Sequence, residues 1–254
     1  LIKGNYDRHL IIPSNIANLT IDGENSAFLR SIRCESNGLL LRNIFLKRCA
    51  SASDADQEAA ITVVSGATLT AIKCSVDGWN GNGVKVEEGG CVKFEDCQIV
   101  NCVQYGILNH GQVDALRLSI TKNKKTGILS RGAGAKVCGE VVNTNENDGN
   151  GMGCDEGGVI EVKSSQMNSN KQVGLCVGAL GSALVRSSCM VRNCMHGASM
   201  SGGYLVMHDC DVRDNGKLGV MLRGGPPGPA GPCSAELVGT TVRGSGNHGV
   251  FMDR

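Results

Sequence analysis

The chain has 254 residues, 41% of them hydrophobic, and a formal net charge of +1. This near-neutral balance gives no basic footprint for a nucleic acid or an acidic membrane surface, and aromatic residues, at 3%, are scarce for a protein that stacks sugars or bases. No apolar run approaches the roughly 18 residues of a membrane span. The length suffices for one large core, so we expect a single domain over residues 1–254.

The 13 cysteines are an odd number, and their spacings do not form a disulfide framework. Many fall on positions expected to face the core, where free Cys acts as a small apolar residue. No signal peptide is recognised at the start of the sequence. We therefore expect an intracellular, reducing compartment, either the cytoplasm or an organelle interior.

Residues 1–64 are expected to form weak, irregular coils. Strand-like stretches occur at 17–21 and 38–46, and a small polar insert follows at 51–56. The segment from Ala60 to Val63 stands one repeat before the first regular glycine, so it is interpreted as an early coil whose glycine has been replaced.

The regular part, residues 65–254, is organised around a glycine followed by an apolar residue. This pair recurs at Gly83, Gly106, Gly127, Gly151, Gly174, Gly197, Gly219 and Gly249. The steps between these anchor glycines are 23, 21, 24, 23, 23, 22 and 30 residues. A fixed period in this range is the signature of a stacked repeat. A Gly/Pro-rich loop at 224–232 accounts for the longest step.

Each repeat also has a fixed pattern of residues expected to point inward. The seventh and ninth residues before the anchor are mostly apolar, as with Ile99 and Cys97 before Gly106. In the coil that ends at Gly197 we assign these places to Val191 and Cys189. A further pair of alternating apolar residues precedes them in each repeat, so every repeat holds three short strands and no window has a helical period.

Strands this short pair with the next repeat at about 4.8 Å rather than within their own. Each coil then buries its apolar face by stacking on its neighbours. The usual crossover preference makes such a coil right-handed. The sequence therefore predicts an all-β, right-handed parallel β-helix, a solenoid of roughly ten to eleven coils with a 21–24-residue period.

The fourth residue before the anchor is an asparagine in five coils: Asn123, Asn147, Asn170, Asn193 and Asn215. Asparagine tolerates left-handed backbone and bonds its own backbone. Stacked at one turn, these amides are expected to form a hydrogen-bonded ladder along the axis. The competing interpretation is that they bind a ligand, but repetition in coil after coil favours stacking.

The phrase Cys97-x-Ile99-x-Asn101-Cys102-x-x-x-Gly106-Ile107 and its copies resemble the parallel β-helix repeats of the pectin-lyase-like superfamily. Within it, the pattern is most similar to the eukaryotic intracellular branch, which includes β-helix regions of F-box substrate receptors and of Shc-binding proteins. This resemblance implies a non-catalytic recognition scaffold. The polysaccharide lyases and hydrolases of the same superfamily are the competing precedent.

The residue two places after each anchor glycine should point outward. In several coils it is large or apolar, and a bare apolar stripe marks a partner surface. We therefore predict a partner-binding row made of Leu108, Leu129, Cys176, Met221 and Phe251. The alternative is that another segment of the same protein covers the row.

A polar site is predicted two places further along the same strands, for the case that the protein is an enzyme. His110 would be a base, Arg131 an anion clamp and Asp155 their partner, on successive coils. The competing interpretation is a solvated strand edge with mixed charges. The row after the anchors offers neither the carboxylate pair of a glycosidase nor the acids and base of a lyase.

No cofactor or metal site is predicted. The sequence has no Cys-x-x-Cys spacing for zinc, no phosphate-binding loop and no dinucleotide fingerprint. The main hypothesis is a protein-binding or assembly scaffold that belongs to a larger protein or complex, with a protein partner or neighbouring subunit. The alternative is a carbohydrate-active enzyme of the pectin-lyase-like superfamily, a polysaccharide lyase or hydrolase. Whether the chain is an enzyme is left open, with the balance against catalysis.

Overall fold

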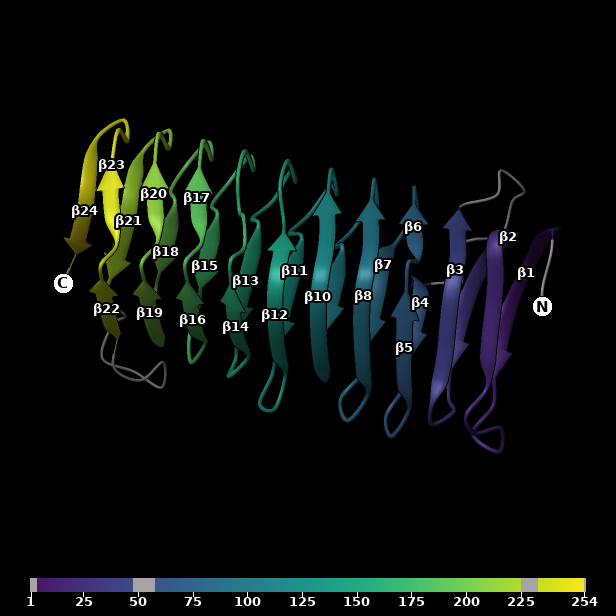
Figure 1. The fold of residues 1–254 in the computed structure, drawn as a ribbon. Helices are drawn as coiled ribbons and strands as arrows, with labels where there is room; N and C mark the ends of the chain where they lie inside the picture. Colours follow the sequence, from purple (N-terminus) through teal and green to yellow (C-terminus); the bar gives the residue numbers. More distant parts are fainter. Residues whose placement is uncertain (1–3, 48–57, 225–232, 254) are drawn as a thin grey trace.

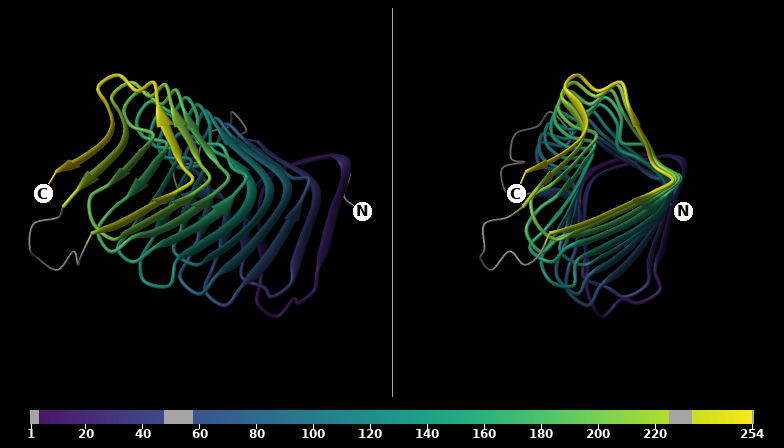
Figure 2. Two further views of the ribbon diagram at one scale, coloured as in Figure 1. Left: turned by 60° about the vertical axis from the view of Figure 1, so that its left-hand side comes forward. Right: turned by 90° about the vertical axis from the view of Figure 1, so that its left-hand side faces the viewer.

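The computed structural model describes residues 4–47, 58–224 and 233–253 of the chain. Successive coils lie side by side from β1 (Gly4–Ile12) at one end to β24 (His248–Asp253) at the other (Figure 1). The coils pair in parallel throughout this part, for example β10 with both β8 and β12. Viewed along the axis, they superpose into a three-sided outline (Figure 2). The predicted parallel β-helix is confirmed.

Three rows of strands run along the axis, one for each side of the coil. The first row follows the anchor glycines and contains β4 (Ala59–Val63), β7 (Asn82–Val86), β9 (Ile107–Asn109), β11 (Ile128–Arg131), β13 (Met152–Asp155), β15 (Leu175–Val177), β18 (Ala198–Met200), β21 (Leu218–Arg223) and β24. The second row contains β5 (Thr68–Ile72), the first halves of β8 (Cys91–Val100), β10 (Gln112–Thr121) and β12 (Lys136–Asn143), then β14 (Val159–Lys163), β16 (Ser182–Arg186), β19 (Tyr204–His208) and β22 (Ser234–Val238). The third row contains β6 (Ser75–Asp77), the second halves of β8, β10 and β12, then β17 (Cys189–Val191), β20 (Asp211–Arg213) and β23 (Thr241–Arg243).

The N-terminal coils are less regular, as the sequence suggested. β2 (Thr20–Cys34) bends through all three rows and pairs with both β3 (Leu39–Lys47) and β4. From β4 to β24 the period is close to 23 residues, over about nine turns, and the ends of β1 and β2 extend the first row. The predicted insert at 51–56 and residues 225–232 of the predicted loop lie outside the described residues.

The inward positions form a continuous apolar core along the axis. Ile99 and Cys97, predicted to point inward, are both buried. Two assignments were wrong in the coil that ends at Gly197: Met190 rather than Val191 takes the seventh position, and the buried Ser188 rather than Cys189 takes the ninth. Met190 pairs in register with the buried Val212 and is fully buried. No residue is missing in this coil, so the ordinary spacing from the anchor holds.

The anchor glycines are required by a close approach between coils. None of them has a positive φ, so a left-handed backbone is not the reason. A Cβ on Gly174 would lie 2.6 Å from the carbonyl oxygen of Gly197 and 2.9 Å from Nδ2 of Asn193. The anchors from Gly83 to Gly219 all face the next anchor's oxygen in this way, at 2.5–2.7 Å. Any side chain here would push neighbouring coils apart.

The predicted asparagine ladder is present and buried. Nδ2 of Asn170 donates to Oδ1 of Asn193 at 3.0 Å, and its Oδ1 accepts both the backbone N–H and Nδ2 of Asn147. The same bonds recur from Asn123 to Asn215. These amides use their donors and acceptors in hydrogen bonds to one another and to the backbone. The geometry therefore does not support the interpretation that they bind a ligand.

Each coil turns sharply where the second row meets the third, at a residue in left-handed conformation. The residues there are Lys73, Asp96, Arg117, Val141, Ser164, Ser187 and Asp209, with φ between 48° and 58°. Val141 is unusual because a β-branched residue adopts this conformation only under strain. The stacking of coils on both sides imposes this conformation on Val141, and no pattern in the sequence predicts it.

Candidate functional site

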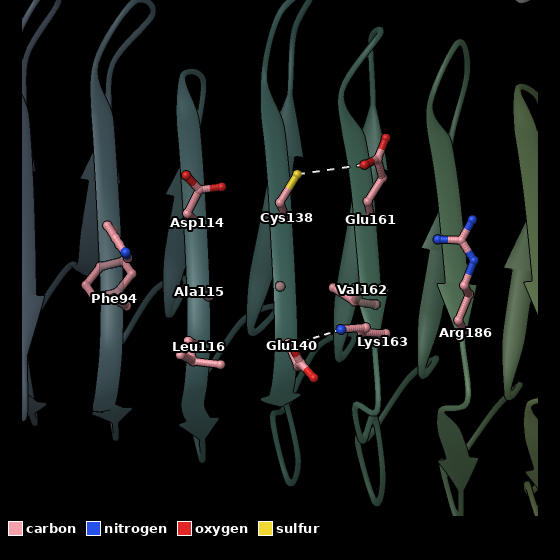
Figure 3. Close-up of a pocket in the computed structure, with 12 residues that line it drawn as sticks. Phe94, Asp114, Ala115, Leu116, Cys138, Glu140, Glu161, Val162, Lys163 and Arg186 are labelled. Atoms are coloured by element: carbon pink, nitrogen blue, oxygen red, sulfur yellow. Dashed lines mark hydrogen bonds and ion pairs between the residues drawn. The ribbon is translucent and has the colours of Figure 1, made fainter.

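An open hollow lies on the outer face of the second row. It is an open groove of about 380 Å³ over β8, β10, β12, β14 and β16 (Figure 3). Strand alternation places the charged side chains outward there, while Ala115, Gly139 and Val162 form a narrow apolar floor between them. Because these three positions point into the core, only their backbone separates the two lines of outward side chains.

Two lines of side chains flank the floor of the groove. Asp114, Cys138 and Glu161 lie in register on three neighbouring strands along one side. Leu116, Glu140, Lys163 and Arg186 lie in register along the other side (Figure 3). Neighbouring strands are about 4.8 Å apart, so side chains from different coils converge on one stretch of groove.

Two of the acids are paired with lysines across coils. Nζ of Lys163 lies 3.0 Å from Oε2 of Glu140, and Nζ of Lys136 lies 2.9 Å from Oε1 of Glu161. The Glu161 carboxylate raises the pKa of Lys136. The Cys138 thiol lies 3.8 Å from the other oxygen of Glu161, and its pKa is raised chiefly by burial. Cys138 is therefore a thiol rather than a thiolate at neutral pH.

Three charged residues of the groove keep their charges free for a ligand. Lys93, Asp114 and Arg186 make no ion pair with any residue in the described ranges. The groove is lined by three cations and three anions, and since Glu140 and Glu161 each have a lysine partner, the unpaired groups are two cations and one anion. The free charge of the groove is thus weakly positive and suits an anionic ligand.

Sequence reasoning missed this groove although its signal was available. The inward pair Val113 and Ala115 was predicted, and the same alternation assigns Asp114 and Leu116 to the outer face. Only the face after the anchor glycines was tested for acids and bases. A larger set of acid and base residues lies on the second row.

The predicted partner-binding row lies in register along the first row, as expected from the anchors. Leu108 pairs with Leu129, Cys176 with Gly153 and Ser199, and Met221 with Phe251. The residues of this row are not equally exposed to solvent: Leu129 is only 8% exposed, whereas Phe251 is 40% exposed. Leu108, Cys176 and Met221 are half-buried. The exposed apolar surface of this row is therefore concentrated at β24.

The predicted polar residues beside this row are also brought together. Arg131 donates from Nε and Nη2 to the two carboxylate oxygens of Asp155, at 2.8 and 2.7 Å. This bidentate pair raises the pKa of Arg131 above its usual value. Nδ1 of His110 lies 3.0 Å from the backbone oxygen of Arg131, and among the described residues His110 makes no hydrogen bond or ion pair with Asp155. The histidine is thus next to the pair but is not joined to its carboxylate.

A second, smaller hollow of about 190 Å³ lies between these two predicted groups. Its floor is Leu129, Gly153 and Cys176, and Arg131 and Asp155 form one rim. The opposite rim is formed by the side chains that precede the anchors, namely Tyr105, Thr126 and Asn150. It unites residues that the sequence assigned to two separate sites.

Within residues 4–47, 58–224 and 233–253, no cluster of three or more His, Cys, Asp or Glu residues is arranged to hold a metal ion. The cysteines of these ranges are all free thiols. Burial raises the pKa of the Cys102 and Cys154 thiols to about 12. In the same ranges, no helix has both the length and the apolar character needed to cross a membrane.

Comparison with known families assigns this architecture. The model of the family described as "Right handed beta helix region" matches residues 107–253, which is more than half of the chain. The chain therefore belongs to this family, and its fold is the right-handed β-helix of the pectin-lyase-like superfamily. The predicted handedness is confirmed. No curated protein matches the sequence.

Solved structures with the same fold are found among carbohydrate-active enzymes. A mutant of the periplasmic alginate epimerase AlgG superposes with a TM-score of 0.62 at 13% identity, covering 95% of this chain and 74% of its own. The pectate lyase Pel9A superposes with a TM-score of 0.60 at 11% identity, covering 96% and 80%. The A-module of the mannuronan C-5 epimerase AlgE4 from Azotobacter vinelandii gives 0.56 at 12% identity, covering 97% and 88%. At these identities the similarity establishes the fold alone.

Proposed function

We propose that the protein binds and acts on an anionic polysaccharide in the groove of the second row. The observation that carries this proposal is the set of converging acids and bases over β8 to β16, with Lys93 and Arg186 free to meet carboxylates of the substrate. The similar epimerases and pectate lyase support the same class of substrate. This was the alternative hypothesis from the sequence, and it takes precedence because the groove brings three acids and three bases together over neighbouring coils.

The groove offers what chemistry at an acidic sugar requires. A cation beside the sugar carboxylate stabilises negative charge that develops next to it when a neighbouring C–H proton is removed. Lys93 and Arg186 are placed for this role at the two ends of the groove. Asp114 is the free carboxylate, and the Glu140–Lys163 pair holds a proton acceptor and a donor 3.0 Å apart. These groups are our candidates for acid–base work.

The test is a screen of purified protein against alginate, polygalacturonate and neutral glucans, with and without calcium. We expect binding of an acidic polymer that weakens as salt is raised, together with unsaturated products detected by ultraviolet absorbance or epimerised residues detected by NMR. The double variant Lys93→Gln/Arg186→Gln should weaken binding at least tenfold, and Glu140→Gln should reduce turnover more than binding. The matched control is Lys124→Gln, because Lys124 is exposed and paired with Asp148 away from the groove.

The proposal fails if no acidic polymer binds, or if the Lys93/Arg186 variant binds as tightly as the parent protein. A melting curve for each variant separates these outcomes from loss of fold. Since the changed side chains are outward, we expect melting temperatures close to that of the parent protein.

A second candidate function is protein binding, as in the intracellular branch that the repeat resembles. One observation favours it: Met221 and Phe251 stack in register and lead to exposed apolar residues on β24, with Met252 71% exposed. The proposed partner is a protein or a neighbouring subunit in a reducing compartment. The change of Met221 and Phe251 to Lys should abolish association while the groove variants leave it intact. Association that is unchanged by these substitutions would rule this candidate out.

A further inference from the structure

The groove of the second row has its two unpaired cations at opposite ends. Lys93 lies on β8 and Arg186 on β16, and neither makes an ion pair with a described residue. Four inter-coil steps separate these strands, so the two cations are roughly 19 Å apart along the axis of the solenoid. This distance is several times the length of one pyranose ring. Two carboxylates that bind both cations therefore belong to sugars that are not neighbours in the polymer.

The strand next to Lys93 disfavours a second acidic sugar beside the first. Asp114 on β10 pairs in register with Lys93 and makes no ion pair with a described residue. The other acid nearby, Glu95, is paired with Arg117 at 3.1 Å. A carboxylate on the sugar that follows the one at Lys93 would lie over Asp114, and the two like charges would repel each other. A neutral sugar at this position donates a hydroxyl hydrogen bond to Asp114.

The middle of the groove offers hydrogen-bond acceptors rather than a site for anions. Glu140 and Glu161 each lie within 3.0 Å of a lysine ammonium, so an anion that approached either lysine would meet the glutamate as well. Both carboxylates keep lone pairs that accept hydroxyl groups. The half-buried Leu116 and the uncharged Cys138 thiol provide contacts for the C–H faces of sugar rings (Figure 3). These groups suit neutral sugars.

We infer that the substrate of this groove is a heteropolysaccharide whose acidic sugars are separated by runs of neutral sugars, rather than a uniform polyuronate. One acidic sugar binds Lys93, the next acidic sugar binds Arg186, and neutral sugars lie over Asp114 and the coils between. The inference rests on the proposed function, since it names the kind of acidic polysaccharide that the same groove takes. General attraction to a weakly positive groove would give the opposite preference, because a uniform polyuronate has the higher charge density.

The test compares oligosaccharides of matched length by isothermal titration calorimetry at one ionic strength. Fragments of deacylated gellan carry glucuronates separated by runs of neutral sugars, whereas polygalacturonate fragments are acidic throughout. We expect the gellan fragments to bind at least about tenfold more tightly than the polygalacturonate fragments. Carboxyl-reduced gellan fragments, in which each glucuronate has become glucose, should bind at least about tenfold more weakly than the native fragments.

A variant of Asp114 tests the source of the preference. Asp114→Asn removes the repulsion over β10 and should strengthen the binding of polygalacturonate by about threefold or more, with a smaller effect on gellan. The matched control is Glu88→Gln, because Glu88 is exposed in the turn before β8 and outside the groove. This control removes the same charge and should leave both affinities close to those of the parent protein. If Asp114→Asn does not fold, as judged by its melting curve, Asp114→Ser replaces it.

The outcomes separate this inference from the proposed function. Polygalacturonate fragments that bind as tightly as gellan fragments would overturn the inference and leave the proposed function in place. Equal effects of Asp114→Asn and Glu88→Gln on polygalacturonate binding would do the same. Equal binding of native and carboxyl-reduced gellan would also overturn the inference, since the two cations would then have no role. Failure of every acidic fragment to bind would contradict the proposed function itself.

Discussion

The asparagine corner and the groove of the second row lie on the same coils, yet they are built by opposite rules. At the corner one residue type recurs and each amide bonds the next, as Asn147 does with Asn170. On the groove face the residue changes in every coil, from Lys93 to Asp114 to Cys138 to Glu161. Stacking requires identity between neighbours, whereas a ligand requires differences. Repetition in this molecule therefore marks stability, and irregularity on an outer face marks a candidate for function.

The largest effect should come from the anchor glycines, compared with a glycine that lies outside the stacking contacts. Gly174→Ala forces a Cβ to within 2.6 Å of the Gly197 oxygen and should lower the free energy of unfolding by about 3 kcal/mol or more. Gly153→Ala, in the same row, meets only ordinary contacts and should change it by less than about 1 kcal/mol. Chemical denaturation of both variants measures the difference. Equal losses would show that close approach is not what selects the anchors.

The next effect concerns the ladder itself. Asn170→Ala removes bonds to Asn147, Asn193 and the Thr144 oxygen, and leaves buried groups unpaired. We expect a loss of about 2–4 kcal/mol, also measured by denaturation.

The control for the ladder is Gln172→Ala, an exposed residue of the same turn, which should be nearly neutral. If Asn170→Ala lowered the free energy of unfolding no more than this control, the hydrogen-bonded ladder would not stabilise the fold. The contrast between a structural corner and a functional groove would then be wrong.

A smaller effect, of opposite sign, is expected at Val141. This exposed residue adopts a φ of 58°, which valine tolerates poorly and asparagine well. Val141→Asn should raise the free energy of unfolding by about 1 kcal/mol. Val103→Asn is the control, since Val103 is 41% exposed, against 36% for Val141, but has no positive φ. A gain at both positions, or at neither, would contradict the strain argument.

The smallest effect on stability should come from the groove. Glu140 and Lys163 form a solvent-exposed ion pair, with side chains 45% and 56% exposed, so Glu140→Gln should change the free energy of unfolding by less than about 1 kcal/mol. The same variant should lose most of any turnover of an acidic polysaccharide. If Glu140→Gln greatly lowered stability but retained turnover, the groove residues would be structural. The contrast between the asparagine corner and the groove would then be contradicted.

Much of the fold was predictable because its cause is local and repeated. The anchor spacing, the inward Ile99 and Cys97 and the ladder from Asn123 to Asn215 follow from a pattern that every coil must satisfy. The pattern was misapplied at Met190, where an expected deletion does not exist. Of the candidate sites, the contact between Arg131 and Asp155 followed from register, but the burial of Leu129 did not.

The sequence by itself determined the parallel β-helix, its period and the faces of its strands, because stacking imposes the same requirement about every 23 residues. Only the tertiary structure decided which outer face is hollowed. The groove depends on how outward charged side chains from different coils lie beside one another, and on which acid pairs with which lysine. Those pairs are set by side-chain geometry between residues that are distant in the chain. The strain at Val141 has the same origin, since neighbouring coils impose a conformation that the residue alone disfavours.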